Sequence, residues 1–85
     1  MAIEPQKNVS PVCVVEFSDG QVTRMTVWSS TGKPDAKRGI KLARHAYRSR
    51  MKYLREPPGI SDVHFEMDGI AMLPLTAEEI AKASQ

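Results

Sequence analysis

The sequence predicts an α+β fold in the order ββαββα, with a four-stranded, mainly antiparallel sheet. One long basic amphipathic helix is expected to pack on one face of the sheet, and a short C-terminal helix to follow. Three observations predict this fold. Two stretches of strand-forming residues each contain an Asp-Gly turn signal, the segment between them has helical periodicity, and a capping-box motif precedes the last residues.

The first hairpin is expected in the stretch VCVVEFSDGQVTRMTVW, whose two arms are rich in β-branched and aromatic residues. A two-residue turn at Asp19-Gly20 would pair Phe17 with Val22. In this register one face of the hairpin packs on the helix and carries Val12, Val14, Met25 and Val27. The other face is directed away from the helix.

The central helix is expected to begin after Asp35, an N-cap residue, and to reach residue 55. Pro57 and Pro58 cannot continue it. Its apolar residues lie within an arc of about 80°: Ala36, Ile40, Ala43, Tyr47, Met51 and Leu54. Gly39 is expected to permit close approach of helix and sheet, and Arg50 to cover the edge of the sheet with its aliphatic stem.

The second hairpin is expected in SDVHFEMDGIAMLPL, with its turn at Asp68-Gly69. Thr76 and Glu79 have the spacing of a capping box, which predicts the start of the C-terminal helix. The order of the four strands does not follow from the sequence.

Composition and length indicate one compact domain over residues 12–85, preceded by a flexible arm over residues 1–11. Hydrophobic residues make up 41% of the chain and charged residues 26%, which is typical of globular proteins. A single cysteine excludes an internal disulfide. The N-terminal residues lack the apolar run of a signal peptide, and no stretch is long enough for a membrane span. A cytoplasmic protein is expected.

Positive charge is concentrated in residues 33–55, which hold nine of the twelve Lys and Arg residues but one of the ten acidic residues. The helix has no Glu–Lys pairs at i,i+4 spacing, and Lys37 and Arg38 lie in its first turn, where cations are unfavourable. Helix stability therefore does not account for this face, although a merely solvated face remains the alternative. We predict that it binds an acidic partner through Lys37, Lys41, Arg44, Arg48, Lys52 and Arg55.

A second, apolar interface is predicted on the hairpin face directed away from the helix. It contains Val15, Phe17, Val22 and Trp28. Exposed apolar patches of several hundred Å² usually mark interfaces. This one would serve a protein partner or a homodimer, unless the N-terminal arm or the C-terminal helix covers it.

The sequence predicts a non-enzymatic binding protein without a metal site or a cofactor. Cys13, His45 and His64 lack the spacing of zinc ligands. Cys13 lies in a β-branched strand, where a buried structural thiol is expected rather than a nucleophile. The stretch SSTGKP lacks the upstream glycine of a phosphate-binding loop, and Pro34 stands where such a loop has Ser or Thr.

The stretches VVEFSDGQVTRMTVWSSTGK and RGIKLARHAYRSR resemble small α+β proteins of bacteriophages and mobile elements, anti-CRISPR proteins among them. This resemblance implies a stoichiometric inhibitor that occludes a nucleic-acid-binding surface of a protein or ribonucleoprotein complex. It assigns no role to any single residue. If the protein is such an inhibitor, we expect acidic residues outside the helix to mimic phosphates: Glu16, Asp19, Asp62, Glu66 and Asp68. The alternative is a small nucleic-acid-binding domain that contacts phosphates through helix 36–55. We expect the inhibitor.

Overall fold

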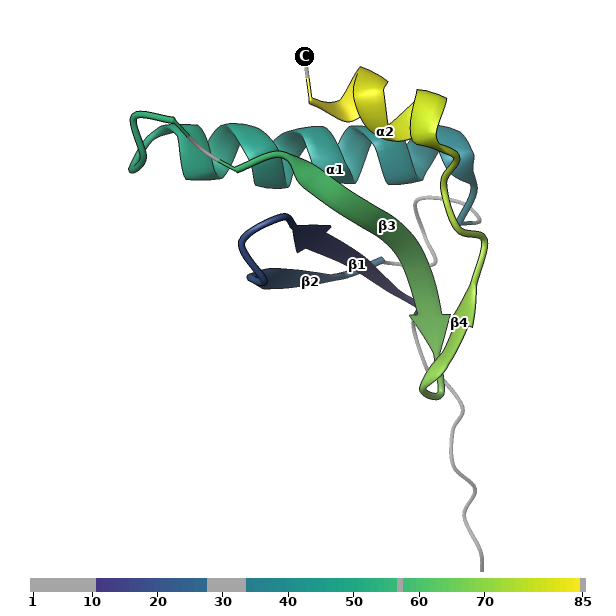
Figure 1. Ribbon diagram of the computed structural model, residues 1–85. Coiled ribbons are helices and arrows are strands. Elements are labelled where there is room, and N and C mark those ends of the chain that lie inside the picture. Colours follow the sequence, from purple (N-terminus) through teal and green to yellow (C-terminus); the bar gives the residue numbers. More distant parts are fainter. Residues whose placement is uncertain (1–10, 28–33, 57, 85) are drawn as a thin grey trace, which may run out of the picture.

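A computed structural model describes residues 11–27, 34–56 and 58–84 of the chain. Its elements are β1 (Val12–Phe17), β2 (Val22–Thr26), α1 (Ala36–Met51), β3 (Ile60–Met67), β4 (Ile70–Met72) and α2 (Ala77–Ala83). The strands form an antiparallel sheet in the order β2-β1-β3-β4. Helix α1 lies across one face of this sheet, and α2 packs against α1 (Figure 1). The predicted α+β class and the ββαββα order are confirmed. Residues 1–10 of the predicted arm lie outside the described residues.

The turn between β1 and β2 differs from the prediction by one residue. Glu16 pairs with Val22, and the loop between Phe17 and Gln21 has three residues. The Gly20 N–H donates to the Phe17 carbonyl at 2.9 Å, and the Phe17 N–H donates to the Gln21 carbonyl at 2.9 Å. Gly20 has a φ of +93°, which closes a three-residue loop and which glycine adopts at little cost.

This shift of one residue corrects the predicted face of β1. Val27 faces α1 as predicted, but the residues of β1 that join it are Cys13, Val15 and Phe17, which are all buried in the core. Val12 and Val14 lie on the opposite side of the sheet. A shift of one residue exchanges the two faces of a strand, because side chains alternate along it.

The β3–β4 hairpin follows the prediction. Met67 pairs with Ile70 around a two-residue turn, and both Asp68 and Gly69 have positive φ, as a type I′ turn requires. Strand β3 lies beside β1 at the centre of the sheet and contributes Val63 and Phe65 to the core. The two central strands therefore provide most of the apolar surface beneath α1.

Helix α1 is rotated relative to the predicted apolar stripe. The Asp35 carboxylate caps it by accepting a hydrogen bond from the Arg38 N–H at 2.8 Å, as predicted. Its buried residues are the small Gly39, Ala43 and Ala46. The helix ends at Met51, which is exposed, as is Leu54 beyond it. Both were predicted to lie on the apolar side of the helix. Small residues let the helix approach the sheet closely.

We expect Gly39 to tolerate alanine but not valine. A Cβ atom at this position would lie 2.7 Å from Leu75 Cδ1 and 3.4 Å from Phe65 Cε2. The end of the Leu75 side chain can rotate away from a methyl group, and alanine favours the helix by up to about 1 kcal/mol. Rotation of Leu75 does not make room for the larger valine side chain, so Gly39→Val should lower the free energy of unfolding by about 1–3 kcal/mol. Urea unfolding of Gly39→Ala and Gly39→Val measures both, and a stable valine variant would contradict the close packing.

Arg50 joins α1 to the first hairpin. Its guanidinium donates to both carboxylate oxygens of Asp19, at 3.0 and 3.3 Å. The same group lies over the Phe17 ring, with 4.6 Å between Cζ and the ring centroid. The hydrogen bonding that Arg50 provides to the Asp19 carboxylate lowers the pKa of Asp19 below its ordinary value. The predicted position of Arg50 at the sheet edge agrees with these contacts.

Helix α2 begins with the predicted capping box. The Glu79 N–H donates to Thr76 Oγ1, and the Thr76 N–H donates to Glu79 Oε1. Ala83 and the partly buried Ile80 pack into the core cluster. In the described parts of the chain, neither helix has the length and apolar character needed to cross a membrane.

Candidate functional site

Helix α1 carries a row of cations on the side opposite the sheet. We define the basic face as Lys37, Lys41, Arg48 and Lys52, which lie within about 60° of one another around the helix. Their mean direction is roughly opposite that of the buried residues Gly39, Ala43 and Ala46. All four are exposed. Arg55 is also exposed, but it lies beyond the end of the helix, so helical periodicity does not place it on this face.

The basic face is not neutralised within the part of the chain that the structure describes. No acidic side chain there forms an ion pair with its four cations, and α1 itself contains no acidic residue. Lys37 and Lys41, and likewise Arg48 and Lys52, have the i,i+4 spacing at which like charges repel. Lys37 also lies in the first turn, where the helix dipole disfavours a cation. Among the described residues, the face is therefore a concentration of positive charge without a structural counterion.

Arg44 was predicted to belong to the same surface, but the structure gives it a different place. Its guanidinium Nη2 donates to the backbone carbonyl of Lys82 at 3.0 Å, near the C-terminal end of α2. Its Nε atom is buried and has no hydrogen-bond partner. A cation is favourable at the C-terminal end of a helix. Arg44 thus joins the two helices and is less available to a partner.

The predicted apolar interface is wrong for two of its four members. Val15 is 0% exposed and Phe17 is 2% exposed, because both lie in the core beneath α1. Val22 is 47% exposed on the opposite side of the sheet. Trp28 lies outside the described residues. The three-residue loop at Gly20 is the cause, since it brings the odd-numbered residues of β1 to the helix side.

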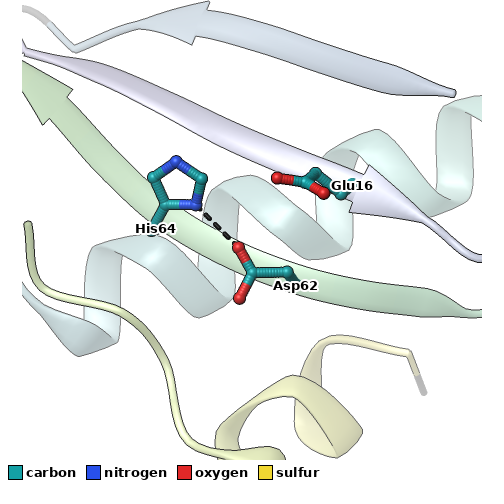
Figure 2. Close-up of side chains that lie close together, drawn as sticks. All are labelled: Glu16, Asp62 and His64. Carbon is teal, nitrogen blue, oxygen red and sulfur yellow. Dashed lines mark hydrogen bonds and ion pairs between the residues drawn. The ribbon is translucent and has the colours of Figure 1, made fainter. Parts of the chain in front are cut away.

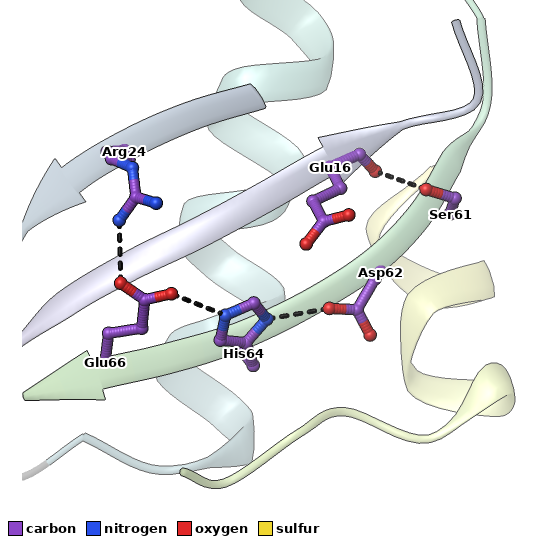
Figure 3. Close-up of polar contacts among 6 residues, drawn as sticks. All are labelled: Glu16, Arg24, Ser61, Asp62, His64 and Glu66. Carbon is purple, nitrogen blue, oxygen red and sulfur yellow. Dashed lines mark hydrogen bonds and ion pairs between the residues drawn. The ribbon is translucent and has the colours of Figure 1, made fainter. Parts of the chain in front are cut away.

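The open face of the sheet, which is the side opposite α1, carries a row of polar side chains instead (Figure 3). Arg24 on β2 donates from Nη1 to Glu66 Oε1 on β3 at 2.7 Å. The second oxygen of Glu66 lies 3.2 Å from Nε2 of His64. The other ring nitrogen, Nδ1, lies 2.7 Å from Asp62 Oδ2. These four residues form a continuous chain of contacts along β3.

His64 is held in this chain on both sides, and its side chain is only 12% exposed. Burial lowers the pKa of His64, but the hydrogen bonds and charges of Asp62 and Glu66 together outweigh it and raise the pKa above its ordinary value. Arg24, and then His64, lower the pKa of Glu66 through their hydrogen bonds. The orientation of the imidazole ring is therefore fixed by its neighbours.

Glu16 on β1 completes a His–carboxylate cluster, which we define as Glu16, Asp62 and His64 (Figure 2). Glu16 is directly opposite Asp62 in the β1–β3 ladder. A β-bulge follows immediately, and the Ser61 hydroxyl donates to the Glu16 backbone carbonyl at 3.1 Å. One carboxylate oxygen from each acid and one ring nitrogen all lie within 4.8 Å of one another.

The sequence did not predict this cluster, because its members come from strands far apart in the chain. Local spacing in the sequence shows only that Asp62 and His64 share one side of a strand. Glu16 joins them through the antiparallel pairing of β1 with β3. The one usable signal was the alternation of Asp62, His64 and Glu66 with apolar residues, which places three polar side chains on one face of β3.

Cys13 is expected to be unreactive in the folded protein. It is 0% exposed, and burial raises the pKa of its thiol to about 11. Because the thiolate is the reactive form, a disulfide reagent should modify Cys13 only after unfolding in urea. Absorbance of the released thiol measures this directly. Rapid modification under native conditions would show that β1 is more accessible than the structure indicates.

Comparison with known proteins adds no assignment, since no family model, curated protein or solved structure matches this chain. The structural candidates are therefore the basic face of α1 and the His–carboxylate cluster on the opposite side of the molecule.

Proposed function

We propose that this protein is a non-catalytic binding protein that contacts the phosphates of a nucleic acid through the basic face of α1. The observation that carries the proposal is that the four cations of this face are exposed and unpaired within the described residues. Such cations gain most from a polyanion, because binding releases the counterions condensed on its phosphates. A cytoplasmic location, where nucleic acid is accessible, is part of the proposal.

The burial of Val15 and Phe17, two of the four residues of the predicted apolar interface, favours nucleic acid over a protein partner. Protein interfaces usually depend on aromatic anchors at their centre. Phe17, one of the two aromatic residues predicted on this surface, is in the core, and the other, Trp28, lies outside the described residues. Tyr53 is 83% exposed just beyond the end of α1, beside the exposed Met51 and Leu54. An exposed ring beside cations suits a nucleic acid, since bases stack on aromatic side chains.

A stoichiometric inhibitor of the anti-CRISPR type is the second candidate, and one observation favours it. The acids Glu16, Asp62 and Glu66 are on the open face of the sheet, on the side opposite the basic face. A protein with separated acidic and basic sides suits a partner that itself binds nucleic acid. The acidic side can occupy the groove in which that partner binds the phosphates of the nucleic acid. In this case the partner is a protein or ribonucleoprotein complex.

Fluorescence anisotropy with labelled duplex DNA, single-stranded DNA and duplex RNA tests the proposal across a series of salt concentrations. We expect dissociation constants of roughly 10⁻⁶–10⁻⁴ M at physiological salt, as for non-specific binding. If all four cations contact phosphates, log K should fall with log salt at a slope of about −3.6 on duplex DNA and about −2.8 on single-stranded DNA. Absence of binding to every probe at low salt would refute the nucleic-acid proposal. Tight binding to an effector complex with little salt dependence would support the inhibitor instead.

A further inference from the structure

The His–carboxylate cluster contains one imidazole and two carboxylates that converge on the open face of the sheet (Figure 2). We propose that Glu16, Asp62 and His64 bind a divalent first-row transition-metal ion, for which Zn²⁺ is the best fit. This site is separate from the basic face of α1, so the inference does not depend on nucleic-acid binding.

The chemistry of the donors determines the class of ion. Zn²⁺ accepts imidazole nitrogen and carboxylate oxygen, and three protein ligands leave a fourth tetrahedral position for water. Mg²⁺ and Ca²⁺ prefer sites made only of oxygen, so His64 selects against them. A tetrahedral zinc ion holds its ligands roughly 3.3–3.5 Å apart. The ligand atoms of the cluster lie within 4.8 Å of one another. The most widely separated ligand atoms must therefore approach by up to roughly 1.5 Å, and His64 Nδ1 and Asp62 Oδ2, which lie 2.7 Å apart, must separate by roughly 0.6–0.8 Å.

The neighbours of His64 are arranged as those of a metal ligand usually are. Nδ1 is the nitrogen that faces Asp62, so it is the ligand atom. Nε2 faces Glu66, and the Glu66 carboxylate accepts a hydrogen bond from Arg24. A histidine ligand commonly donates its second N–H to a carboxylate, which fixes the ring and raises its basicity. The metal ion would take the position of the proton between Nδ1 and Asp62.

The charges of the cluster also favour a cation. Glu16 and Asp62 are directly opposite across the β1–β3 ladder, where like charges are destabilising. The Glu16 carboxylate has no hydrogen-bond or ion-pair partner among the residues that the structure describes. The imidazole must be neutral to bind a metal ion, and the three carboxylates, Glu66 included, then exceed the Arg24 guanidinium by two negative charges. A divalent ion makes this group neutral.

Isothermal titration calorimetry with Zn²⁺ on the full chain without an affinity tag tests the proposal. We expect one saturable site and an increase in melting temperature with added Zn²⁺, because an ion that binds only the folded state stabilises it. Glu16→Gln and His64→Gln each remove a ligand and should abolish saturable binding. Glu66→Gln retains the three ligands and should weaken affinity by about 10- to 100-fold. Asp68→Asn changes one charge on the same hairpin outside the cluster and should bind as the unchanged protein does.

Histidine NMR spectra identify the ligand atom and contain their own control. His45, the other histidine, is exposed on α1, away from the cluster. Zn²⁺ should shift the Nδ1 resonance of His64 and leave His45 unchanged. Zinc binding that persists in both Glu16→Gln and His64→Gln, or equal shifts at both histidines, would overturn the proposal. Equal affinity for Mg²⁺ would show that the imidazole is not a ligand. If His64→Gln does not fold, Glu16→Gln still decides, since it removes a repulsion and should not destabilise the protein.

Discussion

Phe65→Ala is expected to lower the free energy of unfolding by about 3–5 kcal/mol, which is the usual cost of deleting a buried phenyl ring. Phe65 is 0% exposed on the central strand β3, and its ring is close to Gly39 of α1. Removal of the ring leaves a cavity where helix and sheet meet, which neighbouring small residues cannot fill. Small domains are stable by roughly 5–15 kcal/mol, so this change should remove a large part of the total.

Urea unfolding followed by circular dichroism measures the loss. Tyr53→Ala is the matched control, because it also removes an aromatic ring but from a side chain that is 83% exposed. We expect Tyr53→Ala to change stability by less than about 0.5 kcal/mol. A loss below about 1 kcal/mol for Phe65→Ala would mean that the core does not lie between α1 and the sheet.

The elements of the fold could be predicted because their signals are local. Asp68-Gly69 specifies a two-residue turn, and Thr76 with Glu79 specifies a helix start. Asp19-Gly20 was ambiguous, since the same dipeptide also fits a three-residue loop in which only glycine has a positive φ. That ambiguity of one residue exchanged the faces of β1, so the buried Val15 and Phe17 were predicted to be exposed.

The candidate sites could be predicted only where they depend on a single element. Lys37, Lys41, Arg48 and Lys52 follow from helical periodicity alone. The place of Arg44 depends on where α2 packs, which no local pattern specifies. The His–carboxylate cluster depends on both the strand order and the β1–β3 register. Neither was determined by the sequence, so the cluster was missed.

Reversing two charges on the basic face should weaken nucleic-acid binding strongly while leaving the fold intact. At physiological salt each phosphate contact contributes about a fivefold factor through counterion release. Lys41→Glu combined with Arg48→Glu should therefore reduce affinity by at least about 30-fold and make the salt slope shallower by about two. Both side chains are exposed and unpaired within the described residues.

The stability of this double variant should change by no more than about 0.5 kcal/mol. New glutamates relieve the i,i+4 repulsion with Lys37 and Lys52, which stabilises the helix. A glutamate at position 48 lies in the last turn of α1, where the helix dipole opposes it, and this offsets part of the gain. Arg44 is left unchanged because its guanidinium donates a hydrogen bond to the Lys82 carbonyl of α2.

Arg48→Gln and Arg24→Gln form a matched pair, since each replaces an arginine and lowers the net charge equally. Arg24 lies on the open face of the sheet, and its pair with Glu66 is an exposed salt bridge that contributes at most about 1 kcal/mol. We expect Arg48→Gln to weaken binding by about fivefold and Arg24→Gln to have an effect below about twofold, measured by anisotropy on duplex DNA. Equal losses would mean that net charge, not the basic face, governs binding.

If the double variant Lys41→Glu with Arg48→Glu unfolds, the cations of α1 are required for the fold, and the basic face was not retained for a partner.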